Sequence, residues 1–220
     1  MNQSRLQSLQ RKLYGVCTAI VESVDDPEHE GRVTLRFPWL DDSTVSDWCR
    51  VSQLYAGNGY GSLFVPEAKD EVLVAFVHGE MAEPIVLGGL YNGADKPATY
   101  HDSKARKDQK LVRTKAGHQI LLDDGSQSRQ VEIKTAGGHV AGLDDQNKIV
   151  RVKSTGGHEL VLDDSARSIK LTSSVGASIE IDSAGKITIK GTSEIALEAP
   201  KISLTATASV SVSAPQVSLG

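Results

Sequence analysis

The second half of the chain alternates hydrophobic and polar residues in short blocks that return at a nearly fixed step. The block at 117–124 reads Gly-His-Gln-Ile-Leu-Leu-Asp-Asp, and related blocks begin at Gly138, Gly157 and Gly176. The first Asp of successive blocks stands at 123, 144, 163 and 182, so the step is 21 residues and then 19 twice. Each unit carries two alternating apolar pairs, one of which is Leu160 with Leu162. Apolar residues two positions apart are typical of β-strands, so the pattern predicts two short strands per unit.

After Gly185 the repeat becomes shorter, with one apolar pair per unit instead of two. The apolar pairs then fall at Ile187/Ile189, Ile195/Leu197, Ile202/Leu204, Val210/Val212 and Val217/Leu219. One pair every seven or eight residues predicts one strand and one corner per unit. The residues between the pairs are mostly Ser, Thr, Ala, Gly and Lys, and no aromatic residue follows Tyr100. Each strand therefore presents one narrow apolar face.

Such a repeat does not stabilise a single chain. Burying an aliphatic side chain contributes roughly 1.5–3 kcal/mol, whereas ordering one residue costs about 1–2 kcal/mol of backbone entropy. Three chains wound around a common axis would bury every apolar pair and pair every strand edge. We therefore expect 114–220 to form an intertwined trimeric β-helix, or β-prism, in a homotrimer. Its predicted interior residues are Ile169, Leu171, Ile187, Ile189, Ile195, Leu197, Val210 and Val212.

A β-helix made by one chain is the alternative for this repeat. Single-chain helices fill a wide interior with coils of about 20 residues. The half-length period after residue 185 leaves little interior for one chain. The spacing therefore favours the trimer.

The first half of the chain has the pattern of a small all-β barrel over 13–95. Strand-like runs cover 14–24, 31–37, 47–54, 61–65, 71–77 and 84–90, and turn-rich stretches such as Gly57-Asn58-Gly59 separate them. Five or six strands in about 80 residues fit a partly open barrel of the OB type. Leu6 and Leu9 indicate a short amphipathic helix or arm over 1–12, and 96–113 is expected to be a polar connector. The fold class is therefore all-β, with an OB-fold barrel followed by the prism.

Composition limits the possible partners and compartments. The formal charge of −4 is well mixed along the 220 residues, which gives no reason to expect nucleic acid. Cys17 and Cys49 lie in strand-like runs and are expected to be free thiols. The start of the chain lacks the apolar core of a signal peptide, and no segment is long and apolar enough to span a bilayer. We therefore expect synthesis in the cytoplasm.

Paired carboxylates at 123/124, 144/145 and 163/164 could act as the acid and base of a sugar-cleaving enzyme. Adjacent residues of a strand point to opposite faces, however, and these pairs end strands just where a turn must begin. Asp favours that position because its side chain bonds to nearby backbone. The pattern favours turns, and we expect no catalytic residue and no cofactor.

His118, His139 and His158 each follow a Gly at equivalent places in the repeat. In a trimer, three copies of each would approach one axis if they point inward, and such a ring could hold a metal or an anion. The alternative, which we favour, is a corner histidine that bonds to the backbone of a neighbouring chain.

The few aromatic residues could also serve a ligand. Trp39, Trp48, Tyr55 and Tyr60 could form a stacking platform. With so few aromatic residues in the chain, we expect them to belong to the core and rim of the barrel.

An ordered set of six motifs carries a resemblance to a known family. The motifs are Asp26-Pro27, then the segments 31–39, 48–51, 56–61, 64–74 and 84–93. Together they resemble the OB domain of the central spike proteins of contractile injection machines, which include phage baseplate spikes and the VgrG spikes of type VI secretion. The Gly-His blocks of 117–164 are similar to the start of the VgrG-type β-prism. The chain is thus similar to this family over nearly its whole length, without the family's hub, lysozyme and effector domains.

The resemblance implies a non-enzymatic, trimeric spike of a phage tail, a secretion system or a released particle. Its barrel would dock on a trimeric baseplate hub protein, and its prism would be driven through a target envelope with transient contact to the membrane. Some phage spikes of this family close their own tip with a metal held by a His-x-His motif near the C-terminus, but no histidine follows His158 here. The tip is therefore expected to be blunt, with Val217 and Leu219 forming an interface for a PAAR-type tip protein. The alternative is a glycan-binding OB module on a trimeric β stalk.

Overall fold

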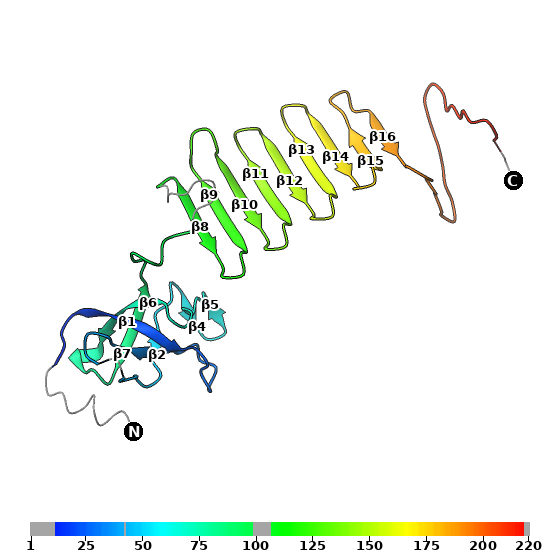
Figure 1. Ribbon diagram of the computed structural model, residues 1–220. Coiled ribbons are helices and arrows are strands. Elements are labelled where there is room, and N and C mark those ends of the chain that lie inside the picture. The colour runs from blue at the N-terminus through cyan, green and yellow to red at the C-terminus, as the bar shows by residue number, and fades with distance from the viewer. Residues whose placement is uncertain (1–11, 42, 99–106, 218–220) are drawn as a thin grey trace. The chain divides into compact units, whose positions relative to one another are not determined.

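The computed structural model describes residues 12–41, 43–98 and 107–217, and these residues form two units built from β-strands (Figure 1). We call Met1–Pro97 the barrel unit and Ala98–Gly220 the sheet unit. Within the described residues, the one helical element is a single 3-10 turn, η1 (Val77–Gly79). The all-β prediction is confirmed. The arm expected over 1–12 lies outside the described residues except for Lys12.

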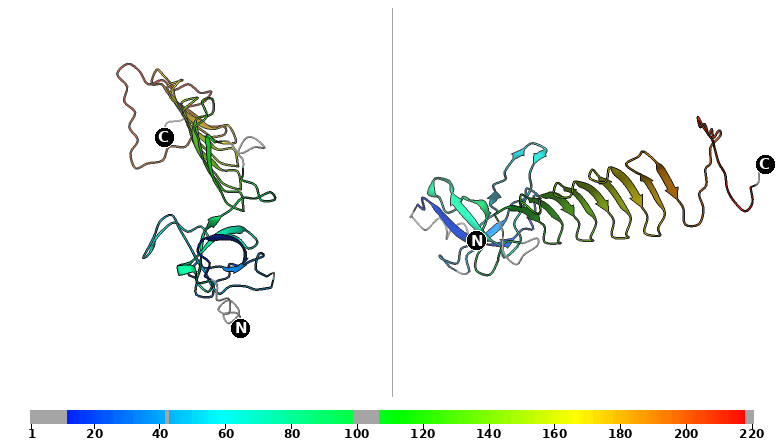
Figure 2. Two further views of the ribbon diagram at one scale, coloured as in Figure 1. Left: turned by 90° about the vertical axis from the view of Figure 1, so that its left-hand side faces the viewer. Right: turned by 90° about the horizontal axis from the view of Figure 1, so that it is seen from above.

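The barrel unit contains a five-stranded sheet with the strand order β2-β1-β6-β7-β3. The strands are β1 (Val16–Ser23), β2 (Thr34–Arg36), β3 (Arg50–Val51), β6 (Glu71–Phe76) and β7 (Pro84–Gly89). The ends of the sheet meet between Val33 and Cys49, whose backbone groups exchange N–H···O bonds of 3.0 and 2.7 Å. The sheet is therefore curled into an OB-like barrel (Figure 2).

The core of the barrel follows from the alternation of side chains along its strands. In β6, Val72, Val74 and Phe76 point inward and are buried, while the residues between them are partly exposed. They pack with the fully buried Leu35 and Phe37. The period of two in the sequence therefore marks the inner face correctly.

A short ribbon of two strands, β4 (Ala56–Gly57) and β5 (Tyr60–Gly61), adjoins the barrel sheet. The strand expected over 61–65 is wrong beyond Gly61. The reason is that residue 64 pairs with a side chain instead of a strand, because Phe64 N–H donates to Gln53 Oε1 at 2.9 Å. The turn expected at Gly57-Asn58-Gly59 is confirmed, since Gly57 pairs with Tyr60 across it.

The sheet unit is a nine-stranded antiparallel meander in which every strand pairs with its neighbours in sequence. Its strands are β8 (Gln109–Arg113), β9 (Gln119–Asp123), β10 (Gln130–Lys134), β11 (Val140–Asp144), β12 (Ile149–Lys153), β13 (Glu159–Asp163), β14 (Ser168–Thr172), β15 (Ser178–Ile181) and β16 (Ile187–Lys190). Two strands per repeat unit are thus confirmed. Strand β8 occupies the end of the stretch 96–113 expected to be a connector, because Leu111 and Val112 pair with Leu121 and Ile120.

The segment 191–217 carries no assigned strand, although its apolar pairs predicted one strand each. In a three-faced arrangement, corners carry consecutive pairs to different faces. A single chain then cannot pair these segments with one another. This part of the strand prediction therefore fails for one chain taken alone.

Candidate assembly face

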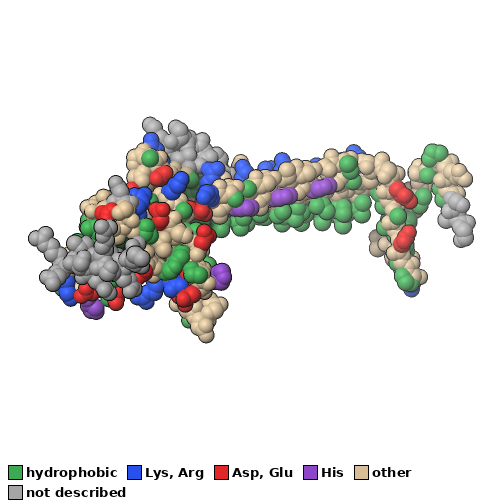
Figure 3. Space-filling model, turned by 60° about the horizontal axis from the view of Figure 1, so that its bottom comes forward, with side chains coloured by type: hydrophobic (Ala, Val, Ile, Leu, Met, Phe, Trp, Pro, Cys, Tyr) green, Lys and Arg blue, Asp and Glu red, His purple; other side chains and the backbone are tan. Residues whose placement is uncertain are grey.

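Two rows of aliphatic side chains run along one face of the nine-stranded sheet. Antiparallel pairing sets each row residue directly opposite the next, for example Ile179 opposite Leu171 and opposite Ile189. The first row contains Leu122, Val131, Leu143, Val150, Leu162, Ile169, Ile181 and Ile187. The second contains Val112, Ile120, Ile133, Ala141, Val152, Leu160, Leu171, Ile179 and Ile189. We call the two rows together the apolar face, and Figure 3 shows hydrophobic side chains gathered along one side of the sheet.

The apolar face remains accessible to solvent in the single chain. Val131 and Val150 are each 39% exposed, and the exposed fraction reaches 62% at Ile187. Monomeric soluble proteins rarely expose a continuous apolar surface of this kind, and such surfaces mark sites of association. The face can therefore bury itself against other chains.

The opposite face of the same sheet is more polar and carries charge pairs, although it also holds Leu111, the buried Leu121, Val140, Ile149 and Val161. Arg151 Nε lies 3.0 Å from Glu159 Oε1, and Lys170 Nζ lies 3.9 Å from Glu180 Oε2 on the neighbouring strand. Exposed pairs of this type contribute little stability, but they keep a surface hydrated. The two faces of the sheet thus differ in chemistry along its length.

Four of the predicted interior residues lie in the two rows, namely Ile169, Leu171, Ile187 and Ile189. The other four, Ile195, Leu197, Val210 and Val212, follow β16 and are 53–72% exposed. Val217 is also exposed, and Leu219 lies outside the described residues. The predicted interior set omitted the row residues of β8 to β13 and of β15, although their spacing of two carries the same signal.

One end of each hairpin is closed by the Gly-His step of the repeat. Before β13, Gly157 N–H donates to Ser154 O at 3.1 Å and His158 N–H to Ser154 Oγ at 3.1 Å. Gly157 has a φ of +86°, and a Cβ there would lie 3.2 Å from the Cβ of Ser174. Only glycine takes this conformation without strain, which explains its return in every block.

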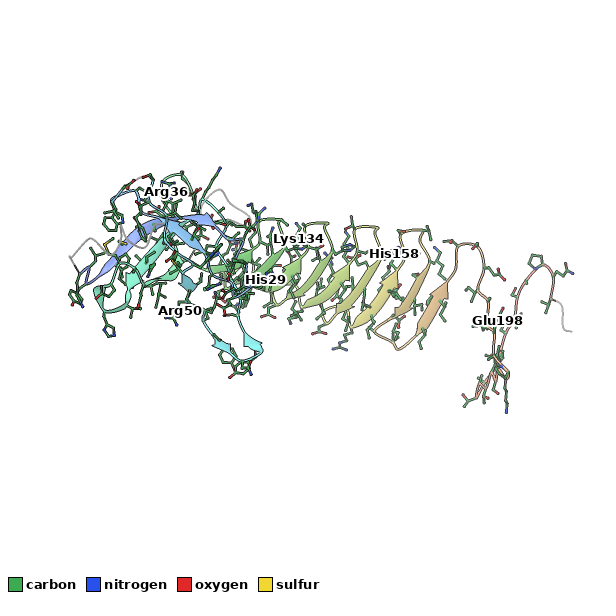
Figure 4. All side chains as sticks on the ribbon, turned by 90° about the horizontal axis from the view of Figure 1, so that it is seen from below. His29, Arg36, Arg50, Lys134, His158 and Glu198 are labelled. Atoms are coloured by element: carbon green, nitrogen blue, oxygen red, sulfur yellow. The ribbon has the colours of Figure 1, made fainter. Side chains whose placement is uncertain are left out.

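The three histidines form a row along this edge of the sheet (Figure 3), and Figure 4 labels His158 among them. Each Nδ1 accepts a hydrogen bond of 3.3 Å from the backbone of the next hairpin in the same chain. The pairs are His118 with Ala136, His139 with Thr155, and His158 with Ser174. In the single chain, Nδ1 of each histidine is thus occupied by the next hairpin of the same sheet. The expected bond to a neighbouring chain stays a prediction, and Nε2 is the ring nitrogen that could make it. Among the described residues, no group of three or more His, Cys, Asp and Glu could hold a metal ion.

The first Asp of each pair closes the other end of its hairpin. The Oδ1 atoms of Asp123, Asp144 and Asp163 accept bonds of 2.8 Å from backbone N–H groups two or three residues ahead. Side-chain bonds of this kind are how Asp stabilises turns. The contacts support the turn interpretation of the carboxylate pairs.

In the barrel unit, one buried carboxylate organises the loop between β1 and β2. Asp26 accepts bonds from the backbone N–H groups of Glu28, Glu30 and Arg32 at 2.9–3.2 Å. The Arg32 guanidinium bonded to both of its oxygens, helped by these N–H groups, holds the pKa of Asp26 well below its usual range. The same pairing raises the pKa of Arg32. Sequence reasoning quoted both residues as motif members but missed their contact.

The two cysteines are free thiols, as expected. Burial raises the pKa of the Cys49 thiol to about 11, and burial also raises the pKa of the half-buried Cys17. Both side chains pack in or against the barrel core. They act there as small apolar residues.

Comparison with protein families identifies both units. Residues 17–91 match the type VI secretion system/phage-baseplate injector OB domain, and residues 148–220 match the phage baseplate V C-terminal trimerisation domain. The chain belongs to the spike proteins of phage baseplates and type VI secretion systems. The trimerisation domain begins at the end of the turn before β12, so it includes the distal part of the apolar face and all of 191–220.

Curated relatives are similar to part of this spike chain. It is 31% identical over 111 residues to the type VI secretion system spike protein VgrG3 of Vibrio cholerae, which covers 46% of the chain and 11% of the relative. It is 28% identical over 134 residues to VgrG1c of Pseudomonas aeruginosa, covering 52% and 18%. It is 36% identical over 91 residues to VgrG4b of the same species, covering 38% and 11%. The matches thus span less than a fifth of each of these relatives.

The structure also bears on contact with membranes. Within the described residues, no helix has the length and apolar character needed to cross a bilayer.

Proposed function

We propose that three copies of this chain associate through the apolar face and form the central spike of a contractile injection machine. The observation that carries the proposal is the double row of exposed aliphatic side chains on a sheet one layer thick. Three copies around one axis would turn these rows inward and remove them from water. The match of 148–220 to a trimerisation domain supports this arrangement.

The two units would have different roles in the spike. The barrel, which we assign to 13–95, would dock on a trimeric hub protein at the centre of the baseplate. The needle, which we assign to 114–220 after a connector over 96–113, would be driven through the target envelope and touch its membrane transiently. Strand pairing along the whole needle would share the load among many parallel contacts.

The far end of the needle would bind a separate tip. Val210, Val212 and Val217 are 54–72% exposed near the end of the described chain. Apolar side chains and strand edges at a blunt end favour a cap. We propose a small PAAR-type protein as that cap, with Val217 and Leu219 in the interface.

The spike would act mechanically, without a catalytic residue, a cofactor or a metal. The turn bonds of Asp123, Asp144 and Asp163 support a structural role for the carboxylates that most resembled an enzyme site. The edge bonds of the three histidines likewise support a structural role.

The mass of the chain in solution tests the proposal. We expect light scattering to give three times the chain mass of 23.5 kDa. The double variant Ile187→Asp/Ile189→Asp should yield monomers, because it would bury six carboxylates in one trimer. Thr188→Asp is the matched control, since Thr188 lies between them on the opposite face of β16 and opposite Glu180. A monomeric wild-type chain, or an unchanged trimer in the double variant, would refute the assembly.

A further inference from the structure

The ribbon of the barrel unit exposes an unusual set of large apolar side chains. We call residues 53–64 the tyrosine ribbon, and it stands away from the barrel in the right-hand view of Figure 2. Its exposed members are Leu54 (95%), Tyr55 (63%), Tyr60 (60%), Leu63 (73%) and Phe64 (61%). A contiguous apolar surface of this type marks an interaction site.

The tip of the tyrosine ribbon is held in one conformation. The rings of Tyr55 and Tyr60 stack at a tilt of 37° with their centroids 5.3 Å apart. Tyr60 lies so close to Gly57 that a Cβ on residue 57 would overlap its ring. A glycine at this position therefore lets the two rings pack together at the surface.

The base of the tyrosine ribbon is also fixed. The amide of Gln53 accepts from Phe64 N–H at 2.9 Å and donates to Phe64 O at 3.3 Å. Above it, Ser62 N–H donates to Tyr55 O at 2.8 Å. Isolated two-stranded hairpins are only marginally stable in water, and these bonds hold the strands together while the apolar side chains face out. A partner would thus meet a preorganised surface, which lowers the entropy cost of binding.

An apolar groove lies beside the base of the ribbon. It has a volume of about 460 Å³ and lies between Leu54 and Phe64 at the base of the ribbon and Val51, Val65, Val86 and Leu87 of the barrel. The barrel unit thus offers both an apolar projection and an apolar recess. In a closed ring of three identical subunits, each contact joins two different surfaces of neighbouring copies. A projection and a recess on one subunit meet that requirement.

We propose that the tyrosine ribbon of one copy packs on the barrel unit of a second copy, in the groove beside that copy's own ribbon. The inference rests on the proposed trimer, whose sheet units would bring three barrels together. Only residues 90–108 separate β7 from β8, and a fully extended chain of that length spans at most about 68 Å. Barrels tethered in this way meet at a high effective concentration, so a modest apolar contact suffices to hold them. The spike would then be joined at its barrels as well as along its needle.

Hydrogen–deuterium exchange on the full chain tests this contact. We expect the amides of 54–64 to exchange at least about tenfold more slowly in the wild-type trimer than in the monomeric Ile187→Asp/Ile189→Asp variant, since a tenfold change corresponds to about 1.4 kcal/mol. The amides of β6 should exchange alike in both. Equal exchange of 54–64 in the trimer and the monomer would overturn the inference and leave the ribbon free or reserved for another protein.

A substitution at Leu54 provides the second measurement. Leu54 is 95% exposed, so Leu54→Ser should leave the stability of the isolated barrel nearly unchanged. In the trimer it should restore fast exchange of the ribbon and lower the melting temperature of the barrel, whereas the monomeric background should show no change. Tyr91→Ser is the control, because Tyr91 is 71% exposed on the same unit outside the ribbon. An equal effect of Leu54→Ser in both backgrounds would contradict the contact.

The mass of each sample separates the two proposals. A trimer with an unprotected ribbon overturns only the barrel contact. A monomeric wild-type chain overturns the proposed spike assembly and this contact together.

Discussion

Asp26 holds the Arg32 guanidinium with both carboxylate oxygens, at 2.8 Å from Oδ1 to Nη2 and 3.1 Å from Oδ2 to Nε. The Asp26 side chain is only 3% exposed and also accepts three backbone N–H groups of its own loop. One carboxylate therefore satisfies five donors. Much of the hydrogen bonding of the loop between β1 and β2 therefore converges on this single side chain, and bonds to a charged carboxylate are among the stronger ones.

Replacing Asp26 by Asn should destabilise the barrel unit. Asn keeps the size of the side chain but loses the charge and one acceptor oxygen. Arg32 then keeps only its exposed partners Glu28 and Glu30, and part of the loop backbone loses an acceptor. We expect a lower melting temperature in a thermal scan followed by circular dichroism. Glu28→Gln is the control, because the Glu28 side chain is 67% exposed and pairs with Arg32 at the surface. If Glu28→Gln lowered the melting temperature as much as Asp26→Asn, the buried carboxylate of Asp26 would not be the main stabilising group of this loop.

The same carboxylate predicts how stability depends on pH. The pKa of folded Asp26 is lowered, first by the hydrogen bond from Arg32, so the folded state holds its proton less tightly than the unfolded state does. The stabilisation is therefore fully present above the unfolded value of about 3.9 and is lost as pH falls below it. The melting temperature of the wild-type barrel should therefore fall between about pH 5 and pH 2, and that of Asp26→Asn should fall by less. If the melting temperatures of the wild type and Asp26→Asn fell equally with pH, the acid sensitivity of the barrel would not come from Asp26.

Much of the sheet unit could be predicted from the sequence because its contacts are local. Each strand from β8 to β16 pairs with the next one along the chain, so the spacing of two and the Gly-His blocks were enough to place the hairpins. The apolar face follows from the same spacing, since Leu160 and Leu162 must share a side of their strand. Periodic patterns work well where neighbours in sequence are neighbours in space.

The features that the sequence left open depend on contacts between distant residues or between chains. Nothing in the Gly-His motif says that His139 reaches Thr155 of its own chain, because that choice depends on how the hairpins stack. Phe64 leaves the predicted strand because one side chain, Gln53, takes its backbone bonds. The segment 191–217 keeps its apolar period but finds no strand partner in a single chain, since the period alone does not say which chain supplies the partner.

The histidine row should stabilise the stacking of hairpins along the edge of the sheet. His158→Phe removes the acceptor for Ser174 N–H, and a neutral hydrogen bond contributes about 0.5–1.5 kcal/mol per chain. His158→Asn keeps an acceptor at a similar position and should recover part of the loss. Thermal unfolding of the two variants measures the difference. Equal stability of the Phe and Asn variants would show that the bond does not matter to the sheet.

The apolar face should be buried beyond the matched trimerisation domain, in strands that precede residue 148. Ile133 on β10 belongs to the second row and is 52% exposed in the single chain, whereas Glu132 lies beside it on the opposite face. If three chains enclose this part of the face, Ile133→Ser should cost about 1.5–3 kcal/mol per chain and lower the melting temperature of the trimer by many degrees. Glu132→Gln, the matched control, keeps the size and hydrogen-bonding capacity of the side chain on the opposite face and should change the melting temperature less. Equal and small effects of both variants would mean that the three sheets separate before β12 and that the enclosed needle starts near residue 148.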